Sequence, residues 1–393
     1  MDFTFTAQEE RFRADLRALL AARLPAGWGD RAFLGDVPPE EHREVEAAIR
    51  RALAERRWLA LGWPADLGGV AAGPIQQAIQ QDESAYLGTP GAVDAGVQWV
   101  GPAIRRYGSE AQRQRHLPAI AAGEETWCTL YSEPGAGSDL AALQTRAVRD
   151  GDEYVLNGSK IWAAGASRAS HGWVAARTDP TAAGHRGLST FIVPMDTPGV
   201  SVRPIVDMDG GTDLAEVFFD DARVPATNLV GDEGRGWYQV TETLDRARAG
   251  VEAFAEGKAN LERLVRAAKD ERSMIAQSPN ARYELADRWI ELEVGYQVAY
   301  RVPYLQAQGE EPNHEASVSK LYGSELTQRI ANTGMHLLGP ASQLSPGSPY
   351  ARLGGAFARL YTRAAAATIA GGPSEVQRNV IAQRGLGLPR SRG

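Results

Sequence analysis

Two short stretches of the chain carry residues suited to holding a polar ligand. The first, LYSEPGAGSDLAAL, spans residues 130–143. Its glycines and proline shape a loop whose backbone N–H groups can converge on an anion, and Ser132 and Ser138 add hydroxyl groups. We expect this loop to suit the phosphates or the polar ring edge of a cofactor, although Gly-Ser-rich turns also occur in β domains without a ligand.

The second stretch, DEYVLNGSKIWAAGA, spans residues 152–166. Trp162 ends a short apolar strand within it. The indole can either lie against a planar ligand or pack into a core, and the stretch alone leaves both alternatives open.

A third stretch, IAGGPSEVQR at residues 369–378, leads from two glycines and a proline into a predicted helix. Ser374 and Gln377 have the Ser-x-x-Gln spacing of a capping box. Gly371 and Gly372 carry no side chain, so the segment is either a simple turn or a place where the chain leaves room for a ligand.

Composition narrows the classes of function. The formal net charge of the 393-residue chain is −7, which excludes a general nucleic-acid or anionic-membrane surface because such surfaces need a basic excess. Cys128 is the only cysteine, which excludes an intrachain disulfide and a cysteine metal cluster. The six histidines show no metal-ligand spacing, so no metal site is expected. Without a signal-peptide pattern or an apolar run of about 20 residues, we expect a cytoplasmic protein with no membrane insertion.

Three consecutive regions must position these stretches, because the hydrophobic periodicity changes twice along the chain. Residues 1–123 are predicted to be helical. Thr6 and Glu9 have capping-box spacing, and Phe12 and Leu16 then follow at helical period.

Residues 124–234 are predicted to form short strands separated by Gly, Pro and Asp. Asn157-Gly158 is expected to be the turn of a hairpin. The spacing of the strands is typical of an antiparallel sandwich or barrel of about 100 residues.

Residues 235–393 return to helical period, with Ser278 as the predicted N-cap of a long helix and Pro279 at its first position. Leu285, Trp289, Leu292 and Tyr296 are predicted to form one apolar stripe of this helix. The predicted fold is therefore α+β and multidomain. It has an N-terminal helical domain, a central antiparallel β-sandwich or barrel, and a C-terminal helical bundle.

Taken together, these stretches resemble the acyl-CoA dehydrogenase family, in particular actinobacterial-type members that lack the usual catalytic Glu. The resemblance rests on motifs that occur in the family order over nearly the whole chain: GWPADLGG, RYGSEAQRQRHLPAIAAGE, WCTLYSEPGAGSDL, DEYVLNGSKIW and GGPSEVQRNVIAQRGLGLPR. The family fold, a helical domain followed by a β domain and a helical bundle, agrees with the periodicity.

The resemblance implies FAD as the cofactor. It assigns the flavin ring, the pyrophosphate and the adjoining contacts to nine residues: Leu130, Ser132, Gly137, Ser138, Trp162, Ala164, Pro373, Ser374 and Glu375. The family usually has Thr where this chain has Ala164, so one hydroxyl group beside the flavin is missing. An anion near a helix start at Ser374 is favourable on physical grounds.

The resemblance also implies α,β-dehydrogenation of an acyl-CoA or similar thioester, in which a carboxylate removes the α-proton. The two positions where the family places this carboxylate hold Gly371 and Ala247. No catalytic base is therefore identified. Substrate contacts are expected at Asp245 and Arg248, together with Ser138 and Gly371.

Other acids lie close in sequence to Ala247 but off its predicted helix face: Glu242, Asp245, Glu252 and Glu256. Each is more simply explained as a solvated helix charge. The Arg-x-x-Phe-Gly loop with which family members contact the FAD of a neighbouring subunit is not recognisable in AKDERSMIAQSP.

Three functions remain open at this point. The first is a dehydrogenase with an unconventional or partner-completed active site, and the second is a non-catalytic subunit of a heteromeric acyl-CoA dehydrogenase. The third is a flavin-dependent oxygenase of the same fold. We expect an electron-accepting flavoprotein as a partner, and a homo-oligomer or a hetero-oligomer with a homologous subunit.

Overall fold

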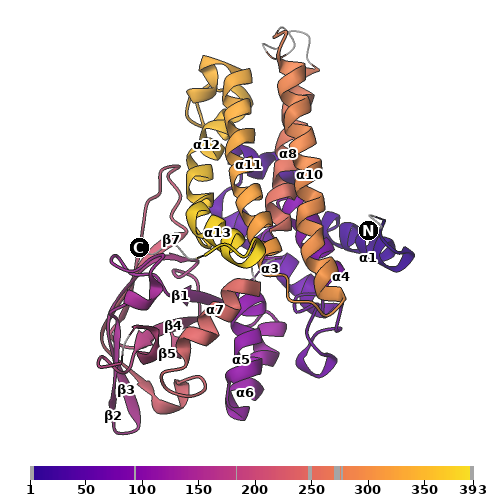
Figure 1. Cartoon of the computed structure of the whole chain (residues 1–393). Helices are drawn as coiled ribbons and strands as arrows, with labels where there is room; N and C mark the ends of the chain where they lie inside the picture. Colours follow the sequence, from indigo (N-terminus) through magenta and orange to yellow (C-terminus); the bar gives the residue numbers. More distant parts are fainter. Residues whose placement is uncertain are drawn as a thin grey trace. The chain divides into compact units, whose positions relative to one another are not determined.

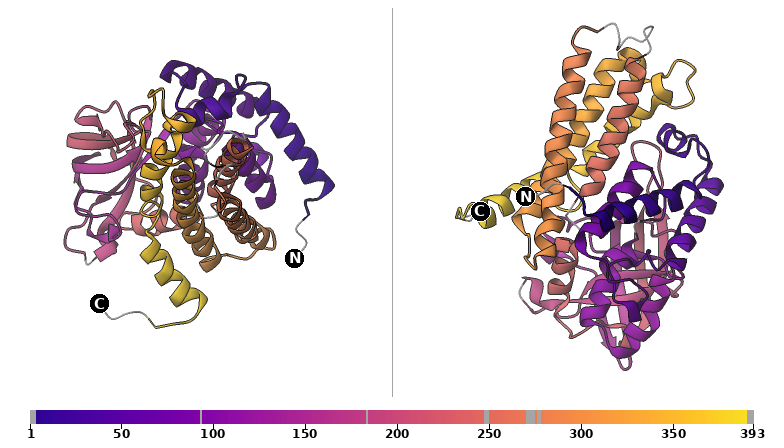
Figure 2. Two further views of the ribbon diagram at one scale, coloured as in Figure 1. Left: turned by 90° about the horizontal axis from the view of Figure 1, so that it is seen from above. Right: turned by 90° about the vertical axis from the view of Figure 1, so that its right-hand side faces the viewer.

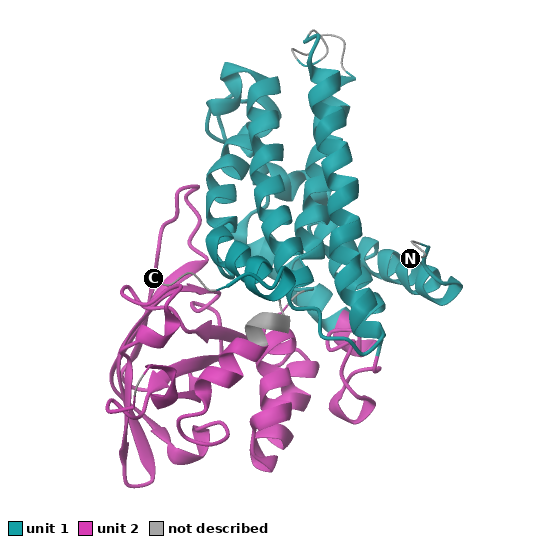
Figure 3. Cartoon of the chain, in the orientation of Figure 1, with its two compact units in different colours: residues 1–52, 72–92, 248–393 teal, residues 53–71, 93–247 magenta. Residues whose placement is uncertain are grey.

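The structure is a computed structural model. It describes residues 4–92, 94–182, 184–246, 250–269, 275 and 278–389, and the backbone alone at residues 243–246. The chain forms two compact units, each assembled from segments that are distant in sequence (Figure 3). Unit 1 comprises residues 1–52, 72–92 and 248–393, and unit 2 comprises residues 53–71 and 93–247.

Unit 1 is helical. Its N-terminal helices are α1 (Ala7–Ala21), α2 (Trp28–Leu34), α3 (Pro39–Glu55, whose last turn enters unit 2) and α4 (Pro74–Tyr86). Its C-terminal helices are α8 (Val251–Ala268), α10 (Ala281–Ala307), α11 (His314–Leu338), α12 (Ala356–Ala367) and α13 (Ser374–Val380). The long helices α8, α10 and α11 pack side by side, as both views in Figure 2 show.

The apolar stripes predicted from the sequence form the core of unit 1. In α1, Phe12, Leu16, Leu19 and Leu20 are buried, and Thr6 caps the helix through the predicted reciprocal hydrogen bonds with Glu9. In α10, Leu292 is fully buried, and Leu285, Trp289 and Tyr296 pack around the same cluster. Helical period alone thus identified the buried faces.

Two predicted helix starts are wrong. Helix α10 begins at Ala281 with Asn280 before it, so Ser278 and Pro279 precede the helix in a turn closed by the Ala281 N–H and the Ser278 carbonyl oxygen. Helix α13 begins at Ser374 itself, with Pro373 in the N-cap position. A capping box at Ser374 and Gln377 is therefore absent.

Unit 2 contains the sheet and helices α5 (Gly101–Tyr107), α6 (Glu110–Ala121) and α7 (Gly236–Arg246), labelled in Figure 1. The strands are β1 (Trp127–Leu130), β2 (Arg146–Asp150), β3 (Glu153–Ala164), β4 (His171–Arg177), β5 (Leu188–Pro194), β6 (Val200–Pro204) and β7 (Leu214–Pro225). Their order is β1-β4-β2-β3-β7-β6, with β5 also paired to β4. The pairs are antiparallel as predicted, except that β4 runs parallel to β1 and β2.

The predicted turn at Asn157-Gly158 is wrong, because β3 runs straight through it. The β3 pairing with β7 shifts register there, and Asn157 exchanges two hydrogen bonds with Asp221, whose φ is +48°. The Asn-Gly pair thus faces a β-bulge in β7. The hairpin turn lies earlier, at Gly151-Asp152, where Gly151 has a φ of +62°.

One face of the sheet buries an apolar cluster that includes Cys128, Leu130, Tyr154 and Phe191. A second cluster joins α5 and α6 to β1 and β4 through Ile104, Leu117, Trp127 and Trp173. None of the described helices combines the length and hydropathy that a membrane-spanning segment needs.

Candidate active site

Trp162 lies on the surface of unit 2, with 59% of its side chain exposed. Its φ is +61°, a left-handed value that non-glycine residues seldom adopt. A second register shift in β3, between Lys160 and Ala163, inserts one extra residue and turns Trp162 outward. The alternative of a core tryptophan is therefore wrong, and the sheet presents a flat apolar surface to solvent.

The 130–138 loop lies directly beside this bulge. The Ile161 N–H donates to the Ser132 carbonyl oxygen at 2.9 Å, which joins the loop to β3 next to Trp162. Gly137 and Ser138 are exposed at the tip of the loop, and Ser132 is half-buried. Ala164 is exposed two residues beyond Trp162 in β3, so the structure brings these predicted residues together.

Leu130 is placed differently from the other loop residues. Its side chain is fully buried in the core of the sheet. Any contact of Leu130 with a ligand therefore has to come from its backbone.

A buried ion pair that sequence reasoning missed holds the loop in place. The Nζ of Lys160, itself fully buried, donates to Glu133 Oε1 at 2.8 Å and to the Tyr131 carbonyl oxygen at 3.1 Å. The Glu133 carboxylate also accepts from the backbone N–H groups of Gln144 at 2.6 Å and Thr145 at 2.9 Å. Glu133 thus fixes both ends of the loop against β3.

The charges of this pair are perturbed by their surroundings. Burial lowers the pKa of Lys160 to about 8, although Glu133 acts in the opposite direction. Burial alone would raise the pKa of Glu133, but the Lys160 charge and the hydrogen bonds to the carboxylate bring it below its ordinary value. Glu133 is therefore ionised at neutral pH. Both residues stand inside the two motif stretches, but no sequence pattern pairs them.

In unit 1, the glycine turn before α13 takes a conformation that favours glycine. Gly371 and Gly372 have φ values of +66° and +95°. A Cβ added at Gly371 would meet no heavy atom within 4 Å. Gln377 is fully buried and donates from Nε2 to the carbonyl oxygens of Gly371 and Gly372. The two hydrogen bonds from Gln377 thus hold the turn in place, and the space beside Gly371 remains open.

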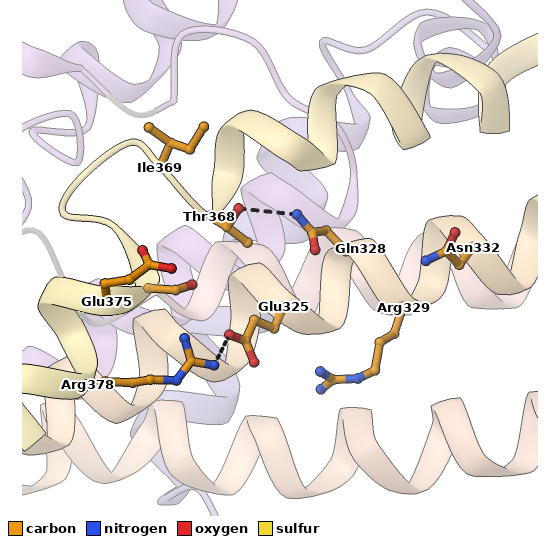
Figure 4. Close-up of a pocket in the computed structure, with 9 residues that line it drawn as sticks. Glu325, Gln328, Arg329, Asn332, Thr368, Ile369, Glu375 and Arg378 are labelled. Atoms are coloured by element: carbon orange, nitrogen blue, oxygen red, sulfur yellow. Dashed lines mark hydrogen bonds and ion pairs between the residues drawn. The ribbon is translucent and has the colours of Figure 1, made fainter.

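A polar cavity of about 410 Å³ lies beside this turn (Figure 4). Its lining comes from α11, the end of α12 and α13: Glu325, Gln328, Arg329, Asn332, Thr368, Ile369, Ser374, Glu375 and Arg378. The Ser374 Oγ is buried and has no hydrogen-bond partner among the residues that the structure describes. A buried hydroxyl in a cavity wall favours a ligand that hydrogen-bonds to it.

Hydrogen bonds hold the polar side chains around this cavity. Arg378 forms an ion pair with Glu325 at 2.5 Å, and the Gln328 Nε2 donates to Thr368 Oγ1 at 3.2 Å, as dashed lines in Figure 4 mark. The structure therefore brings the predicted Ser374 and Glu375 into one cavity. Pro373 directly precedes them at the N-cap of α13.

The candidate bases differ in their surroundings. Glu242 forms an ion pair with Arg106 at 2.6 Å and accepts from the Tyr107 hydroxyl group, so its carboxylate is already engaged. Burial raises the pKa of Glu252. Glu256, one turn further along α8, is exposed to solvent. Ala247, Arg248 and the side chain of Asp245 lie outside the described residues.

Comparison with known proteins identifies the same architecture along the whole chain. Models of the acyl-CoA dehydrogenase N-terminal, middle and C-terminal domains match residues 6–124, 128–222 and 234–386. Acyl-CoA dehydrogenase IpdE1 of Mycobacterium tuberculosis is 36% identical, over 97% of this chain and 98% of its own length.

Two solved structures have the same fold and similar sequences. A protein described as the Tcur3481-Tcur3483 steroid ACAD is 35% identical, with full coverage of both chains and a TM-score of 0.89. A chain of the ChsE4-ChsE5 complex from Mycobacterium tuberculosis is also 35% identical with full coverage, and its TM-score is 0.86.

Proposed function

Because the chain belongs to the acyl-CoA dehydrogenase family of flavoprotein oxidoreductases, we propose that it is a flavin-binding subunit of a heteromeric acyl-CoA dehydrogenase. In this proposal the assembly dehydrogenates an acyl-CoA thioester, and another chain supplies the catalytic carboxylate. The observation that carries the proposal is the exposed Trp162 beside the 130–138 loop, combined with the lack of a carboxylate at both Gly371 and Ala247.

The flavin part of the proposal is supported by three groups of residues. The exposed indole of Trp162 offers a stacking surface for the ring system. The loop at Ser132–Ser138 offers backbone N–H groups and hydroxyl groups beside it. In unit 1, the Ser374 hydroxyl, which has no hydrogen-bond partner in the described part of the chain, and the polar cavity suit a hydrogen-bonding portion of FAD. Bound FAD supplies the electron acceptor for hydride from the substrate β-carbon.

The chain's own residues do not provide the proton acceptor at the family positions. Gly371 has no side chain, and Glu242, an acid close in sequence to Ala247, is held by Arg106 and Tyr107. A positioned base is worth about 10² to 10⁴ in rate, so the lone chain should dehydrogenate slowly. A homologous chain that carries the Glu would supply the missing proton acceptor.

The substrate class follows from the open space at Gly371 and from the relatives. A side chain is missing where the backbone leaves room, which enlarges the surrounding volume. One structural neighbour is described as a steroid ACAD. We therefore propose a bulky polycyclic acyl-CoA rather than a short straight-chain one, and an electron-accepting flavoprotein as the re-oxidising partner.

The experiment compares the lone chain with co-expressed pairs. The chain is purified alone and together with a homologous family member that carries the Glu. FAD content is measured by absorbance, and flavin bleaching is then followed anaerobically with straight-chain and steroid-derived acyl-CoAs. We expect FAD in the complex and fast bleaching only by the bulky substrate.

Two results would contradict the proposal. Fast bleaching by the lone chain would show that a base within this chain removes the α-proton. A purified chain that contains no FAD and forms no complex with a homologue would contradict both the flavin site and the heteromeric assembly. Oxygen uptake with substrate hydroxylation after chemical reduction would instead indicate the oxygenase alternative.

A further inference from the structure

Two histidines and a glutamate converge in unit 2, away from the residues discussed so far. Donor atoms of His116, Glu125 and His171 all lie within 4.8 Å of one another. The His116 Nδ1 lies 3.1 and 3.0 Å from the two carboxylate oxygens of Glu125, and the rings of His116 and His171 are 5.3 Å apart. Their separation in sequence, 116, 125 and 171, hides this cluster from any local motif.

Rigid elements hold the three side chains. His116 lies in α6, Glu125 follows α6, and His171 begins β4 directly opposite Trp127 in the parallel β1–β4 pair. The Trp127 ring stacks on His171 at 4.8 Å and meets His116 edge-on at 5.3 Å. The Ser170 Oγ lies 3.0 Å from the His171 Nδ1. These contacts hold both imidazole rings close to the Glu125 carboxylate.

We propose that His116, Glu125 and His171 form a binding site for a divalent transition-metal ion, and that Zn²⁺ is the ion whose ligand preferences they match. Imidazole nitrogens and a carboxylate are ligands that zinc accepts, at about 2.0–2.2 Å. A tetrahedral site with such bonds separates its ligand atoms by about 3.3 Å. The His116–Glu125 pair already has nearly this separation, and rotation of the His171 side chain closes the rest.

The surroundings suit a cation that enters from solvent. The His116 side chain is 5% exposed, whereas that of Glu125 is 14% exposed and His171 is half-buried. Asp196 and Arg115 are the other charged groups that act on His171. Because metal ligands must be deprotonated, Zn²⁺ would compete with protons for the imidazole nitrogens.

The site is separate from the proposed flavin surface. Trp127 begins β1 and Leu130 ends it, so about 10 Å of strand lies between the cluster and the 130–138 loop. A metal here would link α6 to the β1–β4 pair. Its function would be to stabilise unit 2, and the inference does not depend on the proposed dehydrogenase activity.

The test uses the full-length chain without a histidine tag, treated with EDTA and desalted. Equilibrium dialysis against ZnCl₂ with elemental analysis gives the stoichiometry and affinity, and visible absorption after Co²⁺ addition reports the coordination geometry. We expect one Zn²⁺ per chain and a tetrahedral Co²⁺ spectrum. His171→Phe keeps the ring on Trp127, and Glu125→Gln keeps the side-chain size. Each should weaken Zn²⁺ binding by about tenfold or more.

The matched control is His185→Phe, since His185 contacts Trp237 and Tyr238 instead of the cluster. It should bind Zn²⁺ as the parent does. Thermal unfolding gives a readout that does not require the variants to fold: Zn²⁺ should raise the Tm of the parent, whereas Mg²⁺, which prefers oxygen ligands, should not. A parent with no stoichiometric Zn²⁺ and no shift in Tm would overturn the proposal, as would equal binding by all three variants.

Discussion

At the scale of single residues, Trp162 has two unfavourable properties at once. Its indole is 59% exposed, and its backbone is left-handed at a non-glycine residue. Such a conformation costs of order 1–3 kcal/mol and persists where the surrounding structure imposes it. Here the β3 bulge imposes the left-handed conformation of Trp162. A ligand that stacks on the indole would cover the apolar ring that the bulge exposes.

Trp162→Ala should weaken FAD binding while leaving stability nearly unchanged. Alanine retains the Cβ and with it the backbone strain, so the difference reports the indole alone. The lost stacking is worth about 1 kcal/mol, or about fivefold in Kd. Flavin fluorescence titration and urea unfolding measure the two quantities. Tyr350→Ala, which removes a side chain that is 78% exposed, is the control, and an equal loss of FAD in both variants would refute the stacking role.

Lys160→Met should destabilise unit 2 by about 3–5 kcal/mol, because it leaves the Glu133 carboxylate buried without its counter-charge. The pH dependence should also change. In the parent, the pKa of Glu133 is below its ordinary value, so the stability it contributes is lost as pH falls through and below the ordinary Glu range. In the variant, burial becomes the main influence on the Glu133 carboxylate and raises its pKa. The variant should therefore lose less stability than the parent as the pH falls, or should gain stability.

Urea unfolding of the parent and the Lys160→Met variant between neutral and acid pH measures both effects. The double variant Glu133→Gln/Lys160→Met removes both charges and should recover most of the lost stability. Parallel stability-versus-pH curves for the parent and the single variant would show that the pair is not coupled in the way the structure indicates.

Sequence reasoning found some of these residues and missed others for a physical reason. Trp162 and Ser132 stand in recognisable motifs, so their proximity followed from the family fold. Lys160 stands two residues from Trp162, but its burial depends on a bulge that residue types do not specify. His116 and His171 come together only through α6 and the parallel β1–β4 register, which no local spacing encodes.

At the scale of elements, strand β3 decides the geometry of the candidate site. Gly158, with a φ of +145°, lies where an added Cβ would come within 2.6 Å of Thr145 Oγ1 and 2.8 Å of Thr145 Cα. Glycine therefore permits the close approach of β3 to the chain at Thr145. The same Asn-Gly pair that predicts a turn is used here to accommodate a bulge in the neighbouring strand.

Gly158→Ala should lower the free energy of unfolding by more than about 2 kcal/mol, through overpacking against backbone and an unfavourable φ. Gly151→Ala, in the hairpin turn before β3, is the matched control. Its φ is also positive at +62°, but an added Cβ there meets no heavy atom within 4 Å. It should cost only about 1 kcal/mol. Equal midpoints in urea for the two variants would contradict the role of close packing at Gly158.

Helical elements were predicted better than strand connections. The stripe that contains Leu292 in α10 depends only on the 3.6-residue period, which tertiary contacts preserve. The start of α10 depends on local capping. Ser278 and Pro279 are also suited to a turn, and in the structure they form a turn instead of the first residues of the helix. The prediction of a turn at Asn157-Gly158 was wrong because an Asn-Gly pair suits the irregular backbone beside a β-bulge as well as that of a hairpin turn.

At the scale of the whole molecule, unit 1 exposes an apolar row on α10. Tyr283, Ile290 and Val294 are 75%, 61% and 49% exposed, and their spacing of seven and four residues places them on one face of the helix. A row of this kind on a long helix indicates a surface that another subunit covers. We therefore expect a dimer or tetramer, with this chain alone or with a homologue.

Ile290→Glu should shift the assembly toward smaller species, because a carboxylate on that face would be desolvated on association. Light scattering over a range of protein concentrations measures the mass. Val148→Glu in β2, where the side chain is 59% exposed, is the control and should leave the mass unchanged. A parent mass of one chain at all concentrations would exclude an obligate oligomer.

The order of motifs along the chain sufficed to predict the family and the general architecture. What it did not predict is the grouping of the helices α1 and α4 with α8 to α13 in one compact unit, since that grouping depends on contacts between segments more than 150 residues apart. Substrate chemistry depends on the same long-range assembly, because the base positions and the flavin residues stand in different parts of the sequence.

Restoring a carboxylate should test the partner-completed site directly. At Gly371, a Glu side chain would meet open space but would have to adopt a φ of +66°, which costs about 1–2 kcal/mol. Position 247 lies outside the described residues, within a stretch that the sequence predicts to be helical, where Glu is well tolerated. We therefore expect Ala247→Glu to accelerate anaerobic flavin reduction by acyl-CoA more than Gly371→Glu, toward the 10²- to 10⁴-fold that a positioned base is typically worth, about 3–5 kcal/mol.

Ala247→Gln and Gly371→Gln, which match the size without the charge, should remain as slow as the parent. If the parent already reduces its flavin quickly and Glu252→Gln abolishes this, the half-buried Glu252 on α8 is the base and the other subunit is not needed for proton transfer.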